Sequence, residues 1–194
     1  MSTPNYSSGN SRFNDEALTW DSKPEVVRSS ALCLETLVTS PLLPSLSATS
    51  VLELGCGTGL LTVPLASHVS SILALDTSDG MIGMLDAKIS SHELRNVVAK
   101  VRLLEDANDE VLGGRKFGLV VSHLVMHHVP DMAALVGVMF GTLESGGRVW
   151  VSDFEDNGPQ AELFHPKDKV CGVLFLSLVV VGCVLRGDEL TGIA

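Results

Sequence analysis

The stretch Ser50–Gly59, with the sequence SVLELGCGTG, contains the pattern that decides the fold. Its first half is a short apolar run typical of a buried strand, and its second half carries glycines at alternate positions. Glycines in this arrangement let the backbone turn sharply and approach a ligand closely, because no Cβ lies in the way. We therefore expect a strand that ends in a ligand-binding loop, followed by a helix whose free N–H groups point toward the ligand.

The spacing of these glycines excludes two common nucleotide-binding loops. The dinucleotide fingerprint requires glycines at positions i, i+2 and i+5, but the last position falls on Leu60 when counted from Gly55 and on Thr62 when counted from Gly57. The phosphate-binding loop GxxxxGK[ST] is also absent. A plain tight turn would explain the glycines alone, but it would not explain their combination with Glu53 and with the acidic strand ends described below.

Segments typical of strands and helices alternate along the rest of the chain. Phe13–Trp20 is predicted to be a short helix or turn, and Pro24–Val38 an amphipathic helix. The strands that we expect after Ser50–Leu54 are Ser71–Asp76, Val97–Leu104, Phe117–Ser122 and Gly147–Phe154, and the expected helices are Leu60–His68, Asp79–Ser90 and Asp131–Leu143. This alternation predicts a Rossmann-like, doubly wound α/β fold with a mostly parallel sheet, whose ligands bind beyond the carboxyl ends of the strands.

Carboxylates follow two of the predicted strands. Asp76 ends the second strand, where a carboxylate can accept hydrogen bonds from a ribose diol; the alternatives are a helix N-cap or a surface acid. Asp106 follows the third strand, where an acid could accept a hydrogen bond from an adenine amino group. It lies among the acids Glu105, Asp109 and Glu110, so an ordinary loop acid is the better interpretation of this residue taken alone.

Three histidines follow the fourth strand and are weak candidates for a general base. His123 and His127 have the i, i+4 spacing of a helical metal pair, but His123 falls at a strand end and no third ligand is evident, so we expect no metal site. His127 and His128 are adjacent and point in different directions, so at most one of them can face a ligand. A packed or capping histidine is an equally good interpretation of each.

Charge and cysteine content narrow the class of protein. Acidic residues number 23 against 13 basic ones in 194 residues, which gives a net charge of -10 and disfavours nucleic acid as a partner. The four cysteines show no CxxC spacing or disulfide pattern, and the polar N-terminus lacks the apolar core of a signal peptide. We therefore expect a cytoplasmic protein with a flexible segment at residues 1–12.

The motifs in their order resemble those of class I S-adenosylmethionine-dependent methyltransferases. These motifs are ELGCGTG, LALDTSDGMIGML, LLEDA, FGLVVSHLVMHHVPD and LESGGRVWVSDFE, which follow one another from Glu53 to Glu155. The opening FNDEALTWDSKPE is similar to that of the small-molecule group that includes the ubiquinone- and menaquinone-biosynthesis enzymes. The resemblance extends over about Phe13 to Glu155 and implies a cofactor-binding domain at residues 13–156.

The resemblance also implies roles for individual residues. Glu53 would hold the glycine loop, and Asp76 would bind the ribose. The cofactor-binding residues implied in this way are Trp20, Glu53, Gly55, Cys56, Gly57, Gly59, Asp76, Thr77, Met81, Asp106, Ala107, Ser122 and His123, and Asp21 would help Trp20 to close the site. The family has no universal catalytic residue, which agrees with the reactivity of a sulfonium methyl donor: alignment of the reactants is the main requirement. The implied reaction is in-line methyl transfer to a small organic acceptor; a cofactor-binding protein with little catalytic activity is the alternative.

The C-terminal residues 157–194 depart from this family. The family continues with a further helix and an antiparallel strand pair that completes the sheet, so we expect that pair to be missing or altered here. Val170–Leu185 is a run of 16 residues without charge, shorter than the roughly 20 apolar residues of a membrane span. A membrane anchor, one or two buried strands and an aberrant, truncated end are the possible interpretations, and we favour the last.

Overall fold

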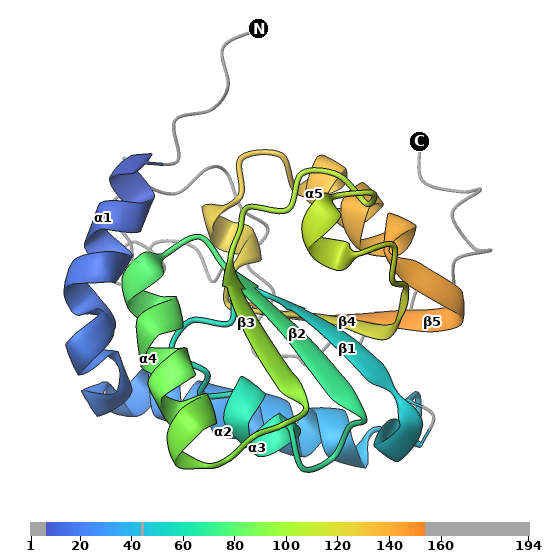
Figure 1. The fold of residues 1–194 in the computed structure, drawn as a ribbon, viewed down its shortest axis with the longest axis horizontal. Coiled ribbons are helices and arrows are strands. Elements are labelled where there is room, and N and C mark those ends of the chain that lie inside the picture. Colours follow the sequence, from blue (N-terminus) through green and yellow to red (C-terminus); the bar gives the residue numbers. More distant parts are fainter. Residues whose placement is uncertain (1–6, 44, 154–194) are drawn as a thin grey trace, which may run out of the picture.

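The computed structural model describes residues 7–43 and 45–153. Within them, five parallel strands form one sheet in the order β3-β2-β1-β4-β5 (Figure 1). The strands are β1 (Ser50–Leu54), β2 (Ser71–Asp76), β3 (Val97–Val101), β4 (Phe117–His123) and β5 (Leu143–Ser152). The order reverses between β1 and β4, so the predicted doubly wound α/β sheet is confirmed, and its ligand crevice is expected beside the carboxyl end of β1.

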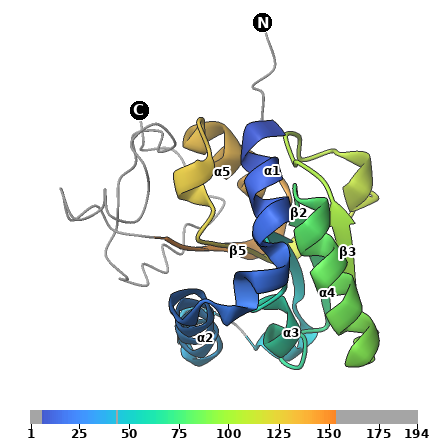
Figure 2. The ribbon, with the colours of Figure 1, turned by 90° about the vertical axis from the view of Figure 1, so that its left-hand side faces the viewer.

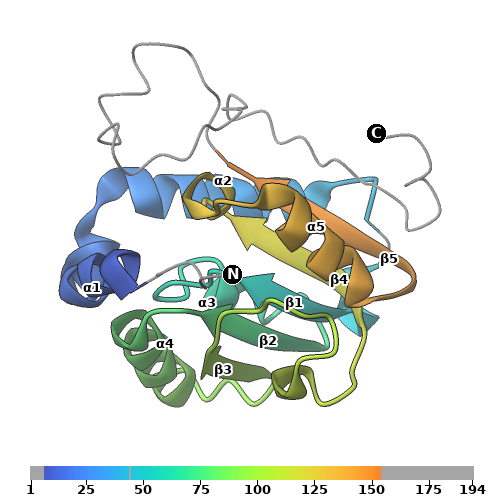
Figure 3. The same cartoon turned by 90° about the horizontal axis from the view of Figure 1, so that it is seen from above.

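Helices cover both faces of the sheet. The α-helices are α1 (Ser7–Glu16), α2 (Pro24–Thr39), α3 (Thr62–Leu65), α4 (Asp79–Ser91) and α5 (Met132–Gly141), and short 3₁₀ turns are η1 (Ala17–Ser22), η2 (Leu46–Ala48), η3 (Glu110–Leu112) and η4 (Met126–His128). Figure 2 shows α2 and α3 on one side of the sheet and α5 on the other. Figure 3 shows α1 beside α4 at one end of the molecule.

Two apolar cores, one on each face, hold these layers together. Cys33 and Leu37 of α2 pack with Leu65 of α3 and Leu85 of α4 against one face of the strands. Met139 of α5 belongs to the second core, on the opposite face. The central strands are buried on both faces, which is why their sequences are continuous apolar runs rather than alternating ones.

The third and fifth strands differ from the sequence prediction at their ends. β3 ends at Val101 instead of Leu104, because its partner β2 ends at Asp76 and offers no further hydrogen bonds; the N–H of Arg102 makes the last one, to the Asp76 carbonyl. β5 begins earlier than predicted, at Leu143, and its first part joins β4 through an irregular register. The early end of β3 matters because it leaves the chain from Arg102 onward free to turn over the sheet edge.

The helix after the glycine loop is shorter than predicted, and the N-terminal helix is longer. α3 contains only Thr62–Leu65 of the predicted Leu60–His68, since the chain is still turning through the loop before Thr62. α1 begins at Ser7, so the structure places residues 7–12 of the segment expected to be flexible in a helix. Residues 1–6 lie outside the described part of the chain.

The C-terminal predictions also fall outside the described residues. The end of the predicted domain at residue 156, the apolar run Val170–Leu185 and the altered strand pair all lie within residues 154–194. Among the residues that the structure describes, no helix is long and apolar enough to cross a membrane.

Candidate functional site

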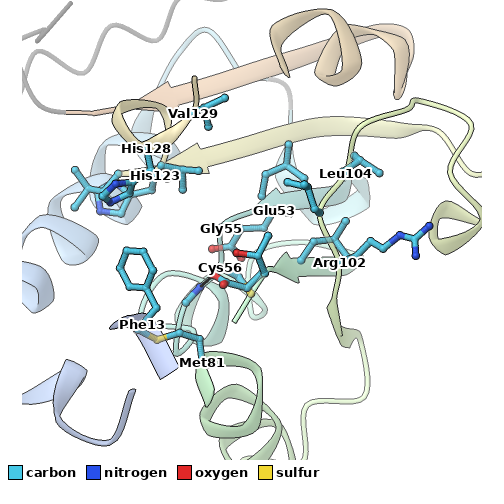
Figure 4. Close-up of a pocket in the computed structure, with 18 of the residues that line it drawn as sticks. Phe13, Glu53, Gly55, Cys56, Met81, Arg102, Leu104, His123, His128 and Val129 are labelled. Carbon is cyan, nitrogen blue, oxygen red and sulfur yellow. Dashed lines mark hydrogen bonds between the residues drawn. The ribbon is translucent and has the colours of Figure 1, made fainter. Parts of the chain in front are cut away.

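A cavity of about 450 Å³ lies at the carboxyl ends of β1, β2 and β4 (Figure 4). Glu53 and Leu54 line it from β1, Asp76 from β2 and His123 from β4. This is the position at which a doubly wound sheet binds its ligand, and the volume lies in the range of cofactor sites. The cavity therefore defines the candidate functional site.

The glycine loop after β1 forms one wall of the cavity through Gly55, Cys56 and Gly57. Gly55 and Gly57 have φ angles of +72° and +54°, in the left-handed region that other residues rarely adopt. A Cβ on Gly55 would lie 2.2 Å from a methyl group of Val125, whereas a Cβ on Gly57 would have nothing within 4 Å. The left-handed backbone of the loop favours glycine at both positions. At Gly55 there is a second reason, because Val125 packs too closely to leave room for a side chain.

Gly59 serves the packing of the loop and does not contact the cavity. Its φ is +84°, and a Cβ there would lie 2.4 Å from Leu85 of α4. Gly59 does not line the cavity, although the family resemblance implies that it contacts the cofactor. Its small size instead permits the glycine loop and α4 to approach each other.

Glu53 is the most deeply buried acid of the site, with 2% of its surface exposed. Its Oε2 atom has no hydrogen-bond partner among the described residues. Burial raises the pKa of Glu53 to about 8, and the negative charge of Asp76 adds to this effect. Glu53 therefore lines the cavity as an acid that is largely protonated at neutral pH.

Asp76 is held by backbone donors. Its Oδ2 accepts a hydrogen bond of 2.8 Å from the N–H of Gly57, and its Oδ1 accepts one of 2.9 Å from the N–H of Ser78. Burial raises the pKa of Asp76, while these donors oppose the shift. Ser78 and not Asp76 caps α4, by accepting a hydrogen bond from the N–H of Met81. The backbone of Thr77 also acts on this carboxylate, so these three donors leave part of its accepting capacity for a ligand in the cavity.

Three further residues of the predicted set also line the cavity: Cys56, Thr77 and Met81. Burial raises the pKa of the Cys56 thiol well above its usual value, so this cysteine is neutral and a poor nucleophile. Met81 is fully buried in the first turn of α4 and presents an apolar surface.

The chain after β3 lines the cavity with other residues than the sequence predicts. Asp106 does not line it; its carboxylate accepts hydrogen bonds from the backbone and side chain of Asn108. Ala107 packs against α5, since a Cβ on Gly141 would lie 2.5 Å from it. The residues that do line the cavity from this segment are Arg102, Leu103, Leu104 and Glu105. Because β3 ends early, the residues that line the cavity lie one to four positions before the predicted Asp106.

The N-terminal segment closes one side of the site. Phe13 and Trp20 line the cavity, and their rings meet edge to face with centroids 5.7 Å apart. Asp21 accepts a hydrogen bond from Thr58 in the glycine loop and pairs with Lys88 of α4 at 2.6 Å. Trp20 thus lines the cavity, and Asp21 links this segment to the glycine loop.

A second link joins α1 to the start of α4. Asn14 Oδ1 accepts hydrogen bonds from the Ser78 hydroxyl at 2.6 Å and from the Gly80 N–H at 2.9 Å. Gly80 is needed here, because a Cβ on it would lie 3.0 Å from the backbone of Asn14. No sequence pattern indicated this contact, which joins residues more than sixty positions apart.

The three candidate histidines occupy different environments. His123 and His128 line the cavity, but His127 does not; it is buried, and its Nδ1 lies 2.6 Å from the Asp153 carboxylate. His123 Nδ1 lies 2.7 Å from the Ser152 hydroxyl, and its Nε2 has no partner among the described residues. Burial lowers the pKa of His123 to about 4, so its imidazole is neutral at physiological pH.

His128 contributes to an aromatic wall instead. Its ring lies edge to face with Phe13, at a centroid distance of 5.3 Å. His123 belongs to a strand and His127 to a 3₁₀ turn, so the helical metal-pair geometry does not form. The described part of the chain contains no cluster of three or more potential metal ligands.

Ser122 is the last residue of the predicted set. It is fully buried in β4, it is absent from the cavity lining, and its hydroxyl has no hydrogen-bond partner among the described residues. The residues that sequence reasoning missed include Phe13, Ser30, Arg102, Val125 and Val129. Of these, Phe13 could have been found, because it opens the segment whose motif contains Trp20.

A parallel sheet with reversed order, a glycine loop after β1 and a partly buried acid at the end of β2 define a nucleoside-binding domain of the Rossmann-like class. Comparison with known families specifies which one. The family described as "Methyltransferase domain" matches residues 45–183, and the chain belongs to it. The resemblance to class I S-adenosylmethionine-dependent methyltransferases is thereby confirmed.

Curated relatives and solved structures agree with this assignment. The chain is 25% identical over 119 residues to a ubiquinone biosynthesis O-methyltransferase of Acinetobacter baylyi, which covers 61% of this chain and 49% of the relative. It spans about half the length of the curated relatives it matches.

Two solved structures share the fold. One is a DhpI-SAM-HEP complex, with a TM-score of 0.64, 24% identity and coverage of 86% of this chain and 74% of that one. The other is the N-methyltransferase NodS from Bradyrhizobium japonicum in complex with S-adenosyl-L-homocysteine, with a TM-score of 0.62, 20% identity and coverage of 78% and 74%.

Proposed function

We propose that this protein binds S-adenosylmethionine in the cavity and transfers its methyl group to a small organic acceptor by in-line displacement. The observation that carries the proposal is the meeting of the glycine loop and Asp76 in one cavity. A hydrogen bond joins Gly57 to Asp76, so the loop and the acid form a single rigid surface. Neither the dinucleotide nor the phosphate-loop glycine pattern is present, which leaves an S-adenosyl nucleoside as the ligand that suits this family.

The lining residues fit the parts of that cofactor. The Asp76 carboxylate lines the cavity and keeps accepting capacity beyond its backbone donors, so it can accept a hydrogen bond from the ribose. Met81 and Leu104 offer apolar surface for the purine, and the left-handed Gly57 leaves open space at the loop for the methionine part. Since Asp106 does not line the cavity, we assign the adenine contact to the segment around Leu104 and Glu105.

When bound, S-adenosylmethionine supplies a methyl group whose departure leaves a neutral thioether. The chain then has to align the acceptor with that methyl and to exclude water, which together can lower the barrier by roughly 7–11 kcal/mol. Phe13, Trp20 and Val129 provide an apolar wall suited to this task. His123 is neutral, and its Nε2 has no partner among the described residues, so it can orient an acceptor hydroxyl or amine.

The acceptor is proposed to be small, because the cavity of about 450 Å³ must also hold the cofactor. Relatives named as O-methyltransferases and a neighbour named as an N-methyltransferase favour an oxygen or nitrogen acceptor without choosing between them. The acidic net charge makes nucleic acid an unsuitable acceptor. A cytoplasmic location remains the expectation from cysteine content.

The experiment is a transfer assay with methyl-labelled S-adenosylmethionine and fractionated small-molecule extracts. We expect label to appear in one or a few small organic products, and the Asp76→Ala variant to reduce this transfer at subsaturating cofactor. Binding of the cofactor without transfer to any fraction would instead favour the catalytically weak alternative. Absence of both binding and transfer would contradict the proposal.

A further inference from the structure

Glu53 is an acid with an unusual environment for a residue beside a ligand cavity. Its side chain is 2% exposed, and Oε2 has no hydrogen-bond partner among the described residues. None of the ion pairs in the described part of the chain includes it. An ionised carboxylate in such a place would be poorly stabilised, so the neutral acid is the favoured form.

Among the residues that the structure describes, no positively charged side chain pairs with Glu53. Beside it in the sheet lie Ala74 of β2 and Val121 of β4. The titratable groups with which it interacts are Asp76 at the end of β2, Cys56 in the glycine loop and Cys33 in α2. Each of these is neutral or negative. Arg102 lines the same cavity, but no basic side chain of the described residues acts on Glu53, so the positive charge that would favour its ionised form is expected from a ligand in this cavity.

Asp76 differs from Glu53 in this respect, although both acids line the cavity. The N–H groups of Gly57 and Ser78 donate to its two oxygens and stabilise its ionised form. Two nearby carboxyl groups in a buried site do not both ionise easily. The geometry therefore places the negative charge on Asp76 and the proton on Glu53.

We propose that Glu53 holds a proton in the cofactor-free protein and releases it to solvent when the positively charged methyl donor binds, so that Glu53 selects for the charged donor over its uncharged-sulfur product. This inference rests on the proposed function. S-adenosylmethionine carries a sulfonium and an ammonium group, whereas S-adenosylhomocysteine has lost the sulfonium charge. In a site of low dielectric constant, the additional charge favours the ionised carboxylate even without direct contact.

Proton release from Glu53 would make the binding of S-adenosylmethionine depend on pH. Burial, with the Asp76 charge, holds the pKa of Glu53 near 8, so the group is almost fully protonated at pH 6.5. A cation binds better to the ionised form. The dissociation constant for S-adenosylmethionine should therefore fall about tenfold from pH 6 to pH 7, by linkage of one proton to binding. Methyl transfer removes the sulfonium charge, after which Glu53 takes up a proton again and the product is held less firmly.

The experiment is titration calorimetry of S-adenosylmethionine binding at pH 6.5, in two buffers with different ionisation enthalpies. At this pH the ligand's own amino group, with a pKa of roughly 7.7–8.0, stays protonated and does not obscure the result. We expect close to one proton to be released per bound S-adenosylmethionine, and fewer per bound S-adenosylhomocysteine. Glu53→Gln should bind with almost no proton release and with less than a twofold change in affinity between pH 6 and pH 7.

Gln has the shape of a protonated Glu, so this variant is expected to fold, and Glu35→Gln on the exposed surface of α2 serves as the matched control with wild-type proton release. Binding of S-adenosylmethionine to the wild-type protein without proton release would overturn the inference and leave the proposed function intact. This result is obtained without any variant. Unchanged proton release in a folded Glu53→Gln would overturn it too. Failure of S-adenosylmethionine to bind at all would overturn the proposed function and the inference with it.

Discussion

Two sides of the same cavity are built by different kinds of interaction. On the side of β1 and β2, backbone groups hold the functional residues: Asp76 receives N–H groups of Gly57 and Ser78, and the loop glycines adopt left-handed conformations. On the side of β4 and β5, side chains hold one another. His123 bonds to Ser152, which in turn lies 3.2 Å from Cys33, and His127 bonds to Asp153.

This difference distinguishes residues that the fold itself holds in place from residues that can change between members of the family. Backbone donors and left-handed glycines belong to the strand-loop-helix geometry and suit one ligand, the cofactor common to a family. Side-chain pairs can be exchanged without changing the backbone, so the β4–β5 side is suited to carry the specificity for a particular acceptor. The predictions below test this division, beginning with the largest expected effect.

Gly55→Ala should cause the greatest damage on the β1–β2 side. The left-handed backbone costs about 1–2 kcal/mol for a residue with a Cβ, and the contact with Val125 adds about 1–3 kcal/mol. The matched change Gly57→Ala has the same backbone cost and no clash. Urea unfolding should show a loss of about 2–5 kcal/mol for the first and about 1–2 kcal/mol for the second. Equal losses would show that contact with the β4 side does not matter.

The stability of the β4–β5 side should depend on pH through His123. Its pKa is about 4 in the folded protein and about 6.5 when unfolded, so between these values the unfolded chain binds more protons. Folding is therefore weakened as the pH falls from about 6.5 to about 4, by up to about 3 kcal/mol. His123→Gln should lose this part of the acid sensitivity, measured by unfolding at several pH values. A parallel pH dependence in both proteins would contradict the burial of a neutral His123.

Asp76→Ala should weaken cofactor binding by about 10- to 150-fold, since charge-assisted hydrogen bonds contribute about 1.5–3 kcal/mol. Asp79→Asn is the matched control, because Asp79 is an exposed acid in the same helix start and does not line the cavity. Calorimetry with S-adenosylhomocysteine measures both. An unchanged dissociation constant in a folded Asp76→Ala protein would exclude the ribose role.

The N-terminal segment should give the smallest effect, because its links to the loop are partly exposed. Asn14→Ala removes two hydrogen bonds to the start of α4, and Asp21→Ala removes the pair with Lys88. Each is expected to weaken cofactor binding about two- to tenfold and to speed proteolytic cleavage before β1. Glu35→Ala, at an exposed position of α2, should change neither quantity. Unchanged cleavage rates in both variants would show that these contacts do not hold the segment.

The sequence predicted one side of this cavity better than the other, for a physical reason. The alternation of apolar runs predicted the sheet. Of the residues proposed for the cofactor, Glu53, Gly55, Gly57 and Asp76 line the cavity, because their spacing reflects local backbone geometry. Asp106 was expected there too, but β3 loses its partner strand at Asp76 and the chain turns earlier.

The contacts between distant side chains could not be predicted from one sequence. Asn14 with Ser78, Asp21 with Lys88 and His127 with Asp153 depend on how whole helices pack, and no periodicity signals such pairs. The prediction that His127 and His128 point in different directions was wrong, because their ring centroids lie 3.9 Å apart, although only His128 lines the cavity. The sequence could not state that His128 lines the cavity and that His127 is buried against an acid.

The most direct test of the central claim, that the β1–β2 side of the cavity is an S-adenosyl nucleoside site, is calorimetry on the wild-type chain with three ligands. S-adenosylmethionine and S-adenosylhomocysteine should each bind at one site per chain, and NAD should give no binding heat, because the loop lacks the dinucleotide glycine spacing. Binding of NAD with no response to either sulfur nucleoside would contradict the account.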